Sequence, residues 1–420
     1  MAGSGPLMDA FAPTLAAAQA RLAAVRPGDY ARSRNQLNGA VTGLSPYLSH
    51  RMISLPEVLG SVASRHRVDL QHKFVYELGW REYFHHVWAW RGDGIFQSLH
   101  QGPLLDIAYA DAVPEDVRQA RTGLPVIDQA VRALYATGYL HNHARMWLAS
   151  YLVHWRKVHW RAGADWLWGH LLDGDLASNH LSWQWVAGTG SHKPYLFNAE
   201  NVRRYAPPDW HSDGTELDHS YETLGALALR SDAWAPVSMA LRAAAVDAME
   251  EPALEAVPPA DWVPPDAAAV AGRDVWLFHP WNLADPPSDL PADVLCVAIC
   301  LREFHQQRPW SARRWRFVGT RMRALAGLRW WGGRAELAVA LRGARSVRSQ
   351  AEPHLGPLLD GLASCQAAPR LFGTVTVPCT SFSQWWRHAT RDISQVDQLP
   401  GLAHWAWSED SAARQERLSF

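Results

Sequence analysis

Cysteine pairs, long apolar runs and net charge are all scarce in this sequence of 420 residues. The four cysteines stand at positions 296, 300, 365 and 379, with no CxxC pair among them. This spacing argues against a disulfide framework and favours a reducing, cytoplasmic location. No apolar run reaches the roughly 18 residues that span a bilayer, so we expect no membrane segment. The Ala-rich start is interrupted by Asp9 and Pro13, which does not fit a secretory signal.

A metal-ligand pattern is missing as well. Several histidines fall between residues 141 and 180, but they fit no HExxH or Cys/His spacing, so we expect no metal site. The net charge of −1 gives no sign of a nucleic-acid binder. A local basic surface is still compatible with the 40 Lys and Arg residues, almost all of them Arg.

Tryptophan, in contrast, is abundant, with 23 copies. A hydrophobic core needs only a few such rings, so this number favours stacking surfaces or electron carriers. The hydrophobic fraction of 48% and the charged fraction of 19% are typical of a folded globular protein. At this length, two domains are the default expectation.

The first half of the chain reads as all-helical. Residues 1–205 carry apolar side chains at helical spacing, for example from Ile127 to Leu134, and little strand-like alternation. Residues 206–272 are rich in Pro, Ala and acidic side chains. They predict a connecting segment, with a helix near 236–250.

Residues 273–420 predict a smaller α/β domain. Short apolar runs alternate there with helical stretches at 311–328 and 352–364, a pattern typical of a parallel sheet. The expected strands read VWLFHP, DVLCVAICL, ELAVALRG and LFGTVTV. The predicted fold class is therefore an all-helical domain followed by a parallel α/β domain.

Four segments of the helical part concentrate polar groups: TGLSPYLS, YELGWREYF, GYLHNHARM and DGDLASNHLSWQW, beginning at residues 42, 76, 138 and 173. The first can present N–H and hydroxyl donors to a phosphate, or simply cap a helix. In the second, Glu77 and Arg81 lie one helical turn apart on the same face. They could belong to a binding site, or they could form an ordinary surface ion pair. In the third, Asn142 and Arg145 share a helical face. The two aspartates of the fourth could pair Arg145 or accept from a ligand.

Taken in order, these segments resemble the flavin-binding domain of the photolyase/cryptochrome family over roughly residues 28–207. The stretches that carry the resemblance are RTGLPVIDQAVRALYATGYLHNHARM and LLDGDLASNHLSWQWVAGTGSHKPYLFNAENVRRY. The resemblance implies a bound FAD in a folded conformation. It names no antenna chromophore, because antenna sites differ within the family. The segment after 273 resembles the family's α/β antenna domain, which normally comes first, and so implies a rearranged domain order.

The resemblance also implies FAD contacts. Thr42, Leu44 and Ser45 match the phosphate loop, where Val41 replaces a frequent threonine and so removes one expected contact. Tyr30 resembles the tyrosine that precedes this loop. The remaining matches are Arg81 on the phosphate side, Asn142 and Arg145 facing the isoalloxazine, Asp173 paired with Arg145, Asp175 on the imide and ribose side, and Asn179 beside N5.

Residues for DNA repair are implied in the same way. The family flips a cyclobutane pyrimidine dimer out of UV-damaged DNA. Trp80 matches the stacking wall, Glu77 the carboxyl that hydrogen-bonds the dimer, and Met146 the methionine beneath it. The (6-4) photolyases have a histidine at the position of Asn142, which argues against that substrate. The iron–sulfur class needs four cysteines around this domain, whereas all cysteines here lie beyond residue 295.

Trp183 and Trp160 match the first two members of the family's electron-transfer chain, with core packing as the alternative reading. Simple spacing puts the third member at Ile107, where no tryptophan occurs. Tyr109 is close by, and other tryptophans that could take the third place are Trp88, Trp90, Trp155 and Trp168. Trp185 is interpreted as packing.

The sequence therefore predicts a light-driven repair enzyme for cyclobutane pyrimidine dimers. Two alternatives are a cryptochrome-like photoreceptor without repair activity and a flavin-free DNA-binding or scaffold protein. Lys193, Arg203 and Arg204 are candidate contacts to DNA phosphates, and the protein is expected to be a monomer.

Overall fold

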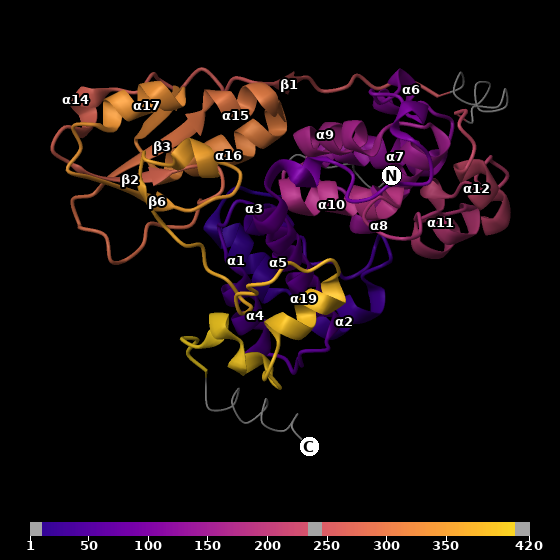
Figure 1. Ribbon diagram of the computed structural model, residues 1–420, viewed down its shortest axis with the longest axis horizontal. Helices are drawn as coiled ribbons and strands as arrows, with labels where there is room; N and C mark the ends of the chain where they lie inside the picture. Colours follow the sequence, from indigo (N-terminus) through magenta and orange to yellow (C-terminus); the bar gives the residue numbers. More distant parts are fainter. Residues whose placement is uncertain (1–10, 234–245, 408–420) are drawn as a thin grey trace, which may run out of the picture.

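The computed structural model describes residues 11–233 and 246–407, and in it a helical part and an α/β part pack against each other (Figure 1). The predicted fold class is confirmed. Of the helix expected near 236–250, residues 236–245 lie outside the described residues, and residues 246–250 are not helical.

The helical part is a set of mostly short helices around the 19-residue helix α5. Its α-helices are α1 (Leu15–Ala23), α2 (Pro27–Ser33), α3 (Ser45–Ser49), α4 (Leu55–Ala63), α5 (Lys73–Arg91), α6 (Glu115–Arg118), α7 (Pro125–Thr137), α8 (Asn142–Ser150), α9 (Trp160–His170), α10 (Leu176–Ala187), α11 (Ala199–Tyr205) and α12 (Tyr221–Ala228). Shorter turns are η2 (Gly92–Phe96), η3 (Asp106–Ala108), η4 (Tyr151–Trp155) and η5 (Pro208–Trp210).

Local sequence signals set the ends of the helices around the cavity described below. Helix α7 begins at Pro125, whose fixed φ suits the first helical turn, and stops at Gly138 with a φ of 67°. Helix α10 is capped by Asp175, whose carboxylate accepts from the Ser178 N–H, and it stops at Gly188 with a φ of 77°. These ends fix where the polar segments before α8 and α10 enter the fold.

The α/β part is built on a five-stranded sheet in which every strand runs parallel to its neighbours, in the order β5-β3-β2-β6-β7. Its strands are β2 (Asp274–Phe278), β3 (Leu295–Leu301), β5 (Leu328–Gly332), β6 (Ser346–Gln350) and β7 (Ser364–Gln366). The helices between and around them are α14 (Ala267–Val270), α15 (Arg302–Gln307), α16 (Ala312–Leu325), α17 (Arg334–Leu341) and α18 (Gly356–Leu359). A short antiparallel pair, β1 (Leu254–Glu255) with β4 (Trp310–Ser311), lies beside them.

This strand order is that of a doubly wound sheet. From β2 the chain moves to β3 and β5 on one side, then crosses to β6 and β7 on the other. The direction of winding therefore reverses between β2 and β6, and such sheets usually bind ligands at the carboxyl ends of the strands at this point.

Two of the four expected strands are confirmed and two predictions are wrong. The runs VWLFHP and DVLCVAICL form β2 and β3. The run ELAVALRG instead forms α17, because Glu336 accepts from the Gly333 N–H in a capping box and most residues after it favour helices. The third strand is β5, which follows the basic helix α16 directly.

The run LFGTVTV forms no strand, because its first backbone groups bind the helical part instead of the sheet. The Leu371 and Phe372 N–H groups both donate to the carboxylate of Glu82 on α5. From there the chain continues into α19 (Phe382–Ala389), which packs against α5. On that surface Trp386 stacks on Tyr76, with ring centroids 4.4 Å apart.

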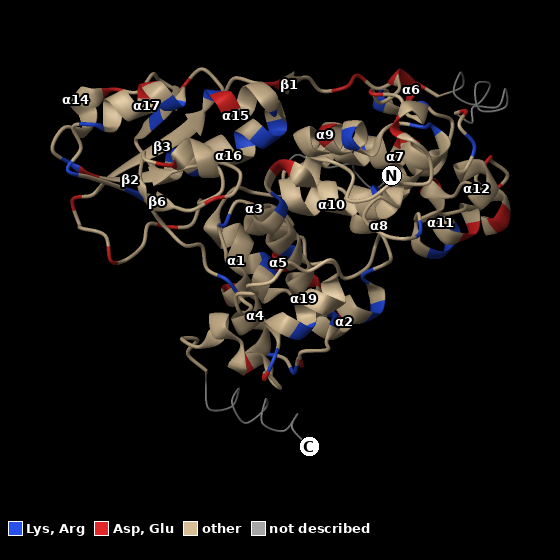
Figure 2. Cartoon of the chain, in the orientation of Figure 1, with Lys and Arg blue, Asp and Glu red and all other residues tan. Residues whose placement is uncertain are grey.

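The last described segment, residues 370–407, therefore returns to the helical part, as Figure 1 shows for α19 beside α5. The division into domains at 1–205, 206–272 and 273–420 stays a prediction. Within the described residues no helix is both long enough and apolar enough to cross a bilayer. Acidic and basic residues are interspersed along the chain in both parts (Figure 2).

The buried contact between Glu82 and the returning segment yields a stability prediction. In Glu82→Ala, the buried Leu371 and Phe372 N–H groups lose their acceptor, so we expect a loss of about 2–3 kcal/mol in the free energy of unfolding. Urea unfolding of the variant measures this loss. Glu222→Ala, which removes an exposed carboxylate on α12, serves as the control and should unfold like the wild type.

Candidate functional site

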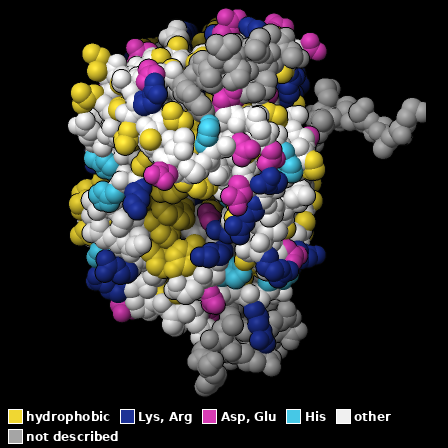
Figure 3. All heavy atoms as spheres, turned by 90° about the vertical axis from the view of Figure 1, so that its right-hand side faces the viewer, with side chains coloured by type: hydrophobic (Ala, Val, Ile, Leu, Met, Phe, Trp, Pro, Cys, Tyr) yellow, Lys and Arg dark blue, Asp and Glu magenta, His cyan; other side chains and the backbone are white. Residues whose placement is uncertain are grey.

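A cavity of about 630 Å³ opens in the helical part, between α2, α5, α8, α10 and the loop before α3. This volume lies in the range of small-molecule and cofactor sites, about 300–1,000 Å³. On the face shown in Figure 3, hydrophobic side chains line a hollow, and Lys and Arg side chains stand at its rim. The predicted site residues that line the cavity are Tyr30, Thr42, Ser45, Glu77, Trp80, Arg81, Asn142, Arg145, Met146, Asp173, Asp175, Asn179 and Trp183. Leu44 and Trp160 are not part of the lining.

The loop before α3 brings hydroxyl groups to the cavity. Gly43 has a φ of 60°, a left-handed conformation that favours glycine, and it turns the chain into α3. The Thr42 Oγ1 accepts from the Leu44 N–H at 3.3 Å, and the Ser45 hydroxyl donates to Asp173 at 2.6 Å. Leu44 itself is buried and precedes α3 as its cap.

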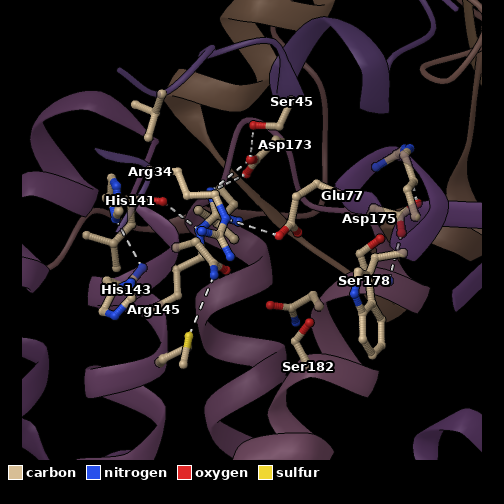
Figure 4. A pocket seen from close by; sticks show the side chains of 18 of the residues that line it. Arg34, Ser45, Glu77, His141, His143, Arg145, Asp173, Asp175, Ser178 and Ser182 are labelled. Atoms are coloured by element: carbon tan, nitrogen blue, oxygen red, sulfur yellow. Dashed lines mark hydrogen bonds and ion pairs between the residues drawn. The ribbon is translucent and has the colours of Figure 1, made fainter. Parts of the chain in front are cut away.

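Arg145 and Asp173, which were expected to pair, form an ion pair on the cavity wall (Figure 4). The Arg145 Nη2 donates to both carboxylate oxygens of Asp173, at 3.0 and 2.8 Å. The Arg145 Nε donates to the Leu140 carbonyl at 2.6 Å, which fixes the guanidinium plane. Because a charged carboxylate is costly to bury alone, this ion pair offsets the cost of burying Asp173 inside the fold.

Asp175 is more deeply buried and has several partners. Besides capping α10, it accepts from His85 at 2.8 Å and lies 3.5 Å from Arg81. Burial alone would raise the pKa of Asp175, but His85 and Arg81 outweigh it and hold the pKa well below its usual range. His85 and Arg81 lie one turn apart on α5, so a single helix face supplies both partners.

Glu77 and Trp80 lie on the same helix, at the open side of the cavity. The Glu77 side chain is 43% exposed and its Oε1 lies 3.4 Å from the Arg34 Nε. The surrounding walls desolvate this carboxyl and raise its pKa, which Arg34 opposes. Trp80 stacks on Phe382 of the returning segment, with centroids 4.2 Å apart and planes within 10° of parallel. Phe382 therefore supports one face of the Trp80 ring.

Asn142 and Met146 lie one turn apart on α8, where the Asn142 amide is within 3.6 Å of the Met146 sulfur. Asn142 is exposed and Met146 half-buried, and both line the cavity. Asn179 on α10 is buried and its amide donates to the Ala164 carbonyl at 2.8 Å.

The predicted electron carriers Trp183 and Trp160 are both buried. The Trp183 ring packs on α9 at Gly163, where an added Cβ would come within 2.3 Å of the indole. Gly163 is one turn beyond Trp160, which is itself 2% exposed. Aromatic contacts continue outwards from Trp160 to His159, at 5.7 Å, and from His159 to Tyr109, at 6.2 Å. Ile107 is 92% exposed and makes no part of this series.

Several cavity residues were not predicted from the sequence. Arg34 lies near Tyr30 by helical spacing, and His141 and His143 flank Asn142, yet such residues are common outside sites and the sequence alone did not single them out. Trp185 was interpreted as packing. It is 41% exposed, lines the cavity and stacks on Tyr195 with centroids 5.6 Å apart. Its exposure, which only the structure gives, marks it as part of the site.

The residues of the cavity fit FAD. The guanidinium groups of Arg34 and Arg81 line it and can donate to the oxygens of a diphosphate. The hydroxyl-bearing loop lies on the same wall, and aromatic and aliphatic side chains supply flat apolar surfaces for the two ring systems. The carboxylates of Asp173 and Asp175 can accept from ring and ribose donors.

Comparison with known proteins agrees with this fit. Residues 74–215 match the family described as the FAD binding domain of DNA photolyase. The chain is 37% identical over 165 residues to the deoxyribodipyrimidine photo-lyase of Streptomyces griseus, covering 39% of this chain and 36% of that protein. It is 31% identical over 218 residues to Cryptochrome-1 of Arabidopsis thaliana, covering 43% of this chain and 30% of that protein. The chain thus spans about a third of the length of these relatives.

Solved structures of the same kind were found. One is an archaeal photolyase from Sulfolobus tokodaii with two FAD molecules, at 27% identity and a TM-score of 0.41, covering 47% of this chain and 45% of that one. Another is a cryptochrome from Synechocystis, at 25% identity and a TM-score of 0.42, covering 57% of this chain and 56% of that one.

The cavity and the matching domain define a flavoprotein whose cofactor is FAD. Over residues 74–215 the chain is similar to the photolyase/cryptochrome family.

The lowered pKa of Asp175 gives a prediction for the apoprotein. A carboxylate with a depressed pKa stabilises the fold above its unfolded-state pKa, about 3.9, and loses this contribution as the pH falls through the lowered folded-state pKa. We therefore expect Asp175→Asn to lower the free energy of unfolding by about 3 kcal/mol at pH 7. The difference from the wild type should shrink below about pH 4.

Urea unfolding from pH 7 to pH 3 measures this difference. Asp209→Asn, which changes an exposed carboxylate, is the control and should follow the wild type throughout. A difference between Asp175→Asn and the wild type that grows on acidification would contradict the assigned role of Asp175.

Proposed function

We propose that the protein repairs cyclobutane pyrimidine dimers in DNA, using light-driven electron transfer from reduced FAD. The observation that carries this proposal is that Glu77, Trp80 and Met146 line the open cavity together with the FAD-site residues. A protein that only bound FAD would need the flavin-side residues but not a stacking wall, a carboxyl and a thioether at the entrance.

Each entrance residue has a role in holding a flipped-out dimer. The exposed face of Trp80 offers a flat apolar wall, and Phe382 behind it keeps the ring in place. Stacking of a base on such a ring contributes about 1–3 kcal/mol. The raised pKa of Glu77 increases its protonated fraction, so its carboxyl can donate to a dimer carbonyl. Trp185, exposed on the same cavity, offers a second aromatic surface.

Reduced FAD held in this cavity would supply the electron for splitting the dimer and would accept it again afterwards. The protein's own residues hold the dimer beside it and exclude water. Trp183 and Trp160 supply electrons inward to reduce the cofactor, and we propose Tyr109, reached through His159, as the outer end of that route. An external thiol refills this outer end.

We propose that the DNA backbone contacts exposed basic residues of the helical part. Lys193, Arg203 and Arg204 are exposed, and Arg203 forms an ion pair with Asp213 at 2.5 Å. Phosphate contacts of this kind position DNA without reading its sequence. We further propose that the protein is a cytoplasmic monomer. In its proposed domain order, a helical FAD domain at 1–205 comes first, a connection at 206–272 follows, and an antenna-like α/β domain at 273–420 comes last.

The second candidate function is that of a cryptochrome-like photoreceptor, which keeps FAD and photoreduction but does not repair DNA. It is supported by the similarity to Cryptochrome-1 of Arabidopsis thaliana and to Cryptochrome DASH of Gloeobacter violaceus, the latter 31% identical over 206 residues, covering 47% of this chain and 41% of that protein. A repair assay separates the two. Fully reduced protein under blue light should restore thymine dimers in a short oligonucleotide, and failure with intact reduced flavin would favour the photoreceptor.

The role of Trp80 can be tested by binding. We expect Trp80→Ala to weaken binding of dimer-containing oligonucleotide by about 5- to 150-fold, because one stacking surface is lost. Trp90→Ala is the matched control, since Trp90 lies on the same helix, is 49% exposed and does not line the cavity. Fluorescence anisotropy with damaged and undamaged DNA measures both. Equal loss in the two variants would remove Trp80 from the dimer site.

The electron route can be tested by photoreduction of oxidised FAD in the presence of a thiol. We expect Trp183→Phe to lower the rate at least tenfold, since phenylalanine is far harder to oxidise, and Tyr109→Phe to lower it as well. Trp147→Phe, a fully buried tryptophan outside the route, is the control and should keep the wild-type rate. A wild-type rate in Trp183→Phe would exclude this route.

A further inference from the structure

The Asp173–Gly174–Asp175 turn on the cavity wall is contacted from behind by the α/β part. Arg314 of α16 reaches into the helical part and is fully buried. Its Nη2 donates to the Gly174 carbonyl at 2.6 Å, and its Nη1 donates to the Trp168 carbonyl at 3.1 Å. The contact leaves no free space, because a Cβ on Gly174 would come within 2.5 Å of the Arg314 Nη1.

The charge of Arg314 is matched by groups of the flavin site. Its guanidinium lies between two indole rings, 4.4 Å from the centroid of Trp168 and 4.2 Å from that of Trp310. Burial lowers the pKa of Arg314 to about 9, and the nearby carboxylates of Asp173 and Asp175 oppose this shift. At neutral pH the α/β part therefore places a buried positive charge directly behind the two cavity carboxylates.

A second contact comes from the loop after β6. The His354 Nε2 accepts from the Leu176 N–H at 3.2 Å, at the start of α10, and lies 4.0 Å from the Asp175 carboxylate. The other ring nitrogen of His354 is bound to Glu352, which pairs with Arg51 of the helical part at 2.8 Å. His354, like Arg314, thus supports the turn through the groups that surround Asp175.

These contacts use the edge of the sheet where doubly wound folds usually bind a ligand. At the reversal between β2 and β6, the Trp281 ring stacks on His354 with centroids 4.4 Å apart and planes within 12° of parallel. The Pro280 carbonyl, also after β2, is bound by the buried His50 of the helical part. The chain's own side chains therefore fill the space at the carboxyl ends of β2 and β6, and their contacts join the two parts.

We propose that the α/β part is a structural component of the flavin site, in which Arg314 and His354 are positioning residues that hold the Asp173–Gly174–Asp175 turn and balance its charge. The proposal rests on FAD binding and not on DNA repair. Without Arg314 the two carboxylates would lose one of the positive charges that offset their own charge beside an anionic cofactor. FAD would then bind more weakly, and its reduced form would be disfavoured relative to its oxidised form.

The test uses the full-length protein with FAD removed and added back. In Arg314→Met we expect at least tenfold weaker FAD binding by calorimetric titration. We also expect at least a tenfold change in the oxidised-to-reduced ratio, which is a fall of about 30 mV in the two-electron midpoint potential. Arg314→Lys, which keeps the charge but loses the two-pronged contact, should retain the potential while binding FAD less tightly.

Arg321→Met is the matched control. Arg321 lies two turns further along α16 and is buried, but it binds the Leu283 carbonyl and Asp285 inside the α/β part. It should lower the melting temperature of the apoprotein without changing the FAD dissociation constant or the midpoint potential. Unchanged values for both quantities in Arg314→Met would overturn the proposal.

Two further variants keep the proposal testable if Arg314→Met does not fold. His354→Phe preserves stacking on Trp281 and removes the acceptor for Leu176, and Gly174→Ala pushes on Arg314 from the flavin side. Both should weaken FAD binding, and wild-type FAD affinity in both would refute the proposal. None of these measurements uses DNA. The role of Arg314 and His354 in FAD binding can therefore be tested even if the protein does not repair DNA.

Discussion

Two carboxylates only two residues apart, Asp173 and Asp175, are buried in a single turn, and the site depends on the cations that pair with them. Removing a carboxylate from water costs several kcal/mol unless a cation and hydrogen bonds replace the solvent. Arg145 supplies the cation for Asp173, while His85 and Arg81 supply it for Asp175. Arg145 lies on α8, and Arg81 and His85 lie on α5. These side chains can pair with the two carboxylates only when both helices have packed around the turn.

This requirement joins the two parts of the chain into one unit. Arg314 is buried among aromatic rings and backbone carbonyls, a position that would be unfavourable for a cation without negative charge close by. The carboxylates of the turn provide that charge, and Arg314 in turn offsets their mutual repulsion. The return of residues 370–407 to α5 adds a second connection, in which Phe382 supports Trp80 and Glu82 binds the backbone.

Much of the site was predictable because it lies in local motifs. The polar segments before α8 and α10 carry their residues at helical spacing, so Asn142 and Arg145, or Asp175 and Asn179, are brought to one wall by helix geometry alone. Residues that act across the fold were not predictable. His85, Arg314 and Trp185 stand in helices that also read as ordinary amphipathic or aromatic segments.

The strands show the same limit. The runs that form β2 and β3 are buried on both faces and were recognised, whereas ELAVALRG is equally apolar but caps and propagates a helix. The β-branched residues of LFGTVTV are typical of a strand. Its first N–H groups, however, donate to the Glu82 carboxylate and not to a neighbouring strand. Backbone groups must be paired somewhere, and the nearest available partner decides which structure forms.

By itself the sequence determined the class of the protein. Helical periodicity, turn residues and the order of the polar segments specify a helical flavin domain and a parallel α/β part, because these features depend on residues close together in the chain. Only the tertiary structure decided which charges face one another across helices, that Phe382 lies behind Trp80, and that the edge of the sheet holds the flavin turn. Those contacts join residues far apart in the chain, 90 positions for His85 and Asp175 and 140 positions for Arg314 and Gly174, and no local pattern encodes such a pairing.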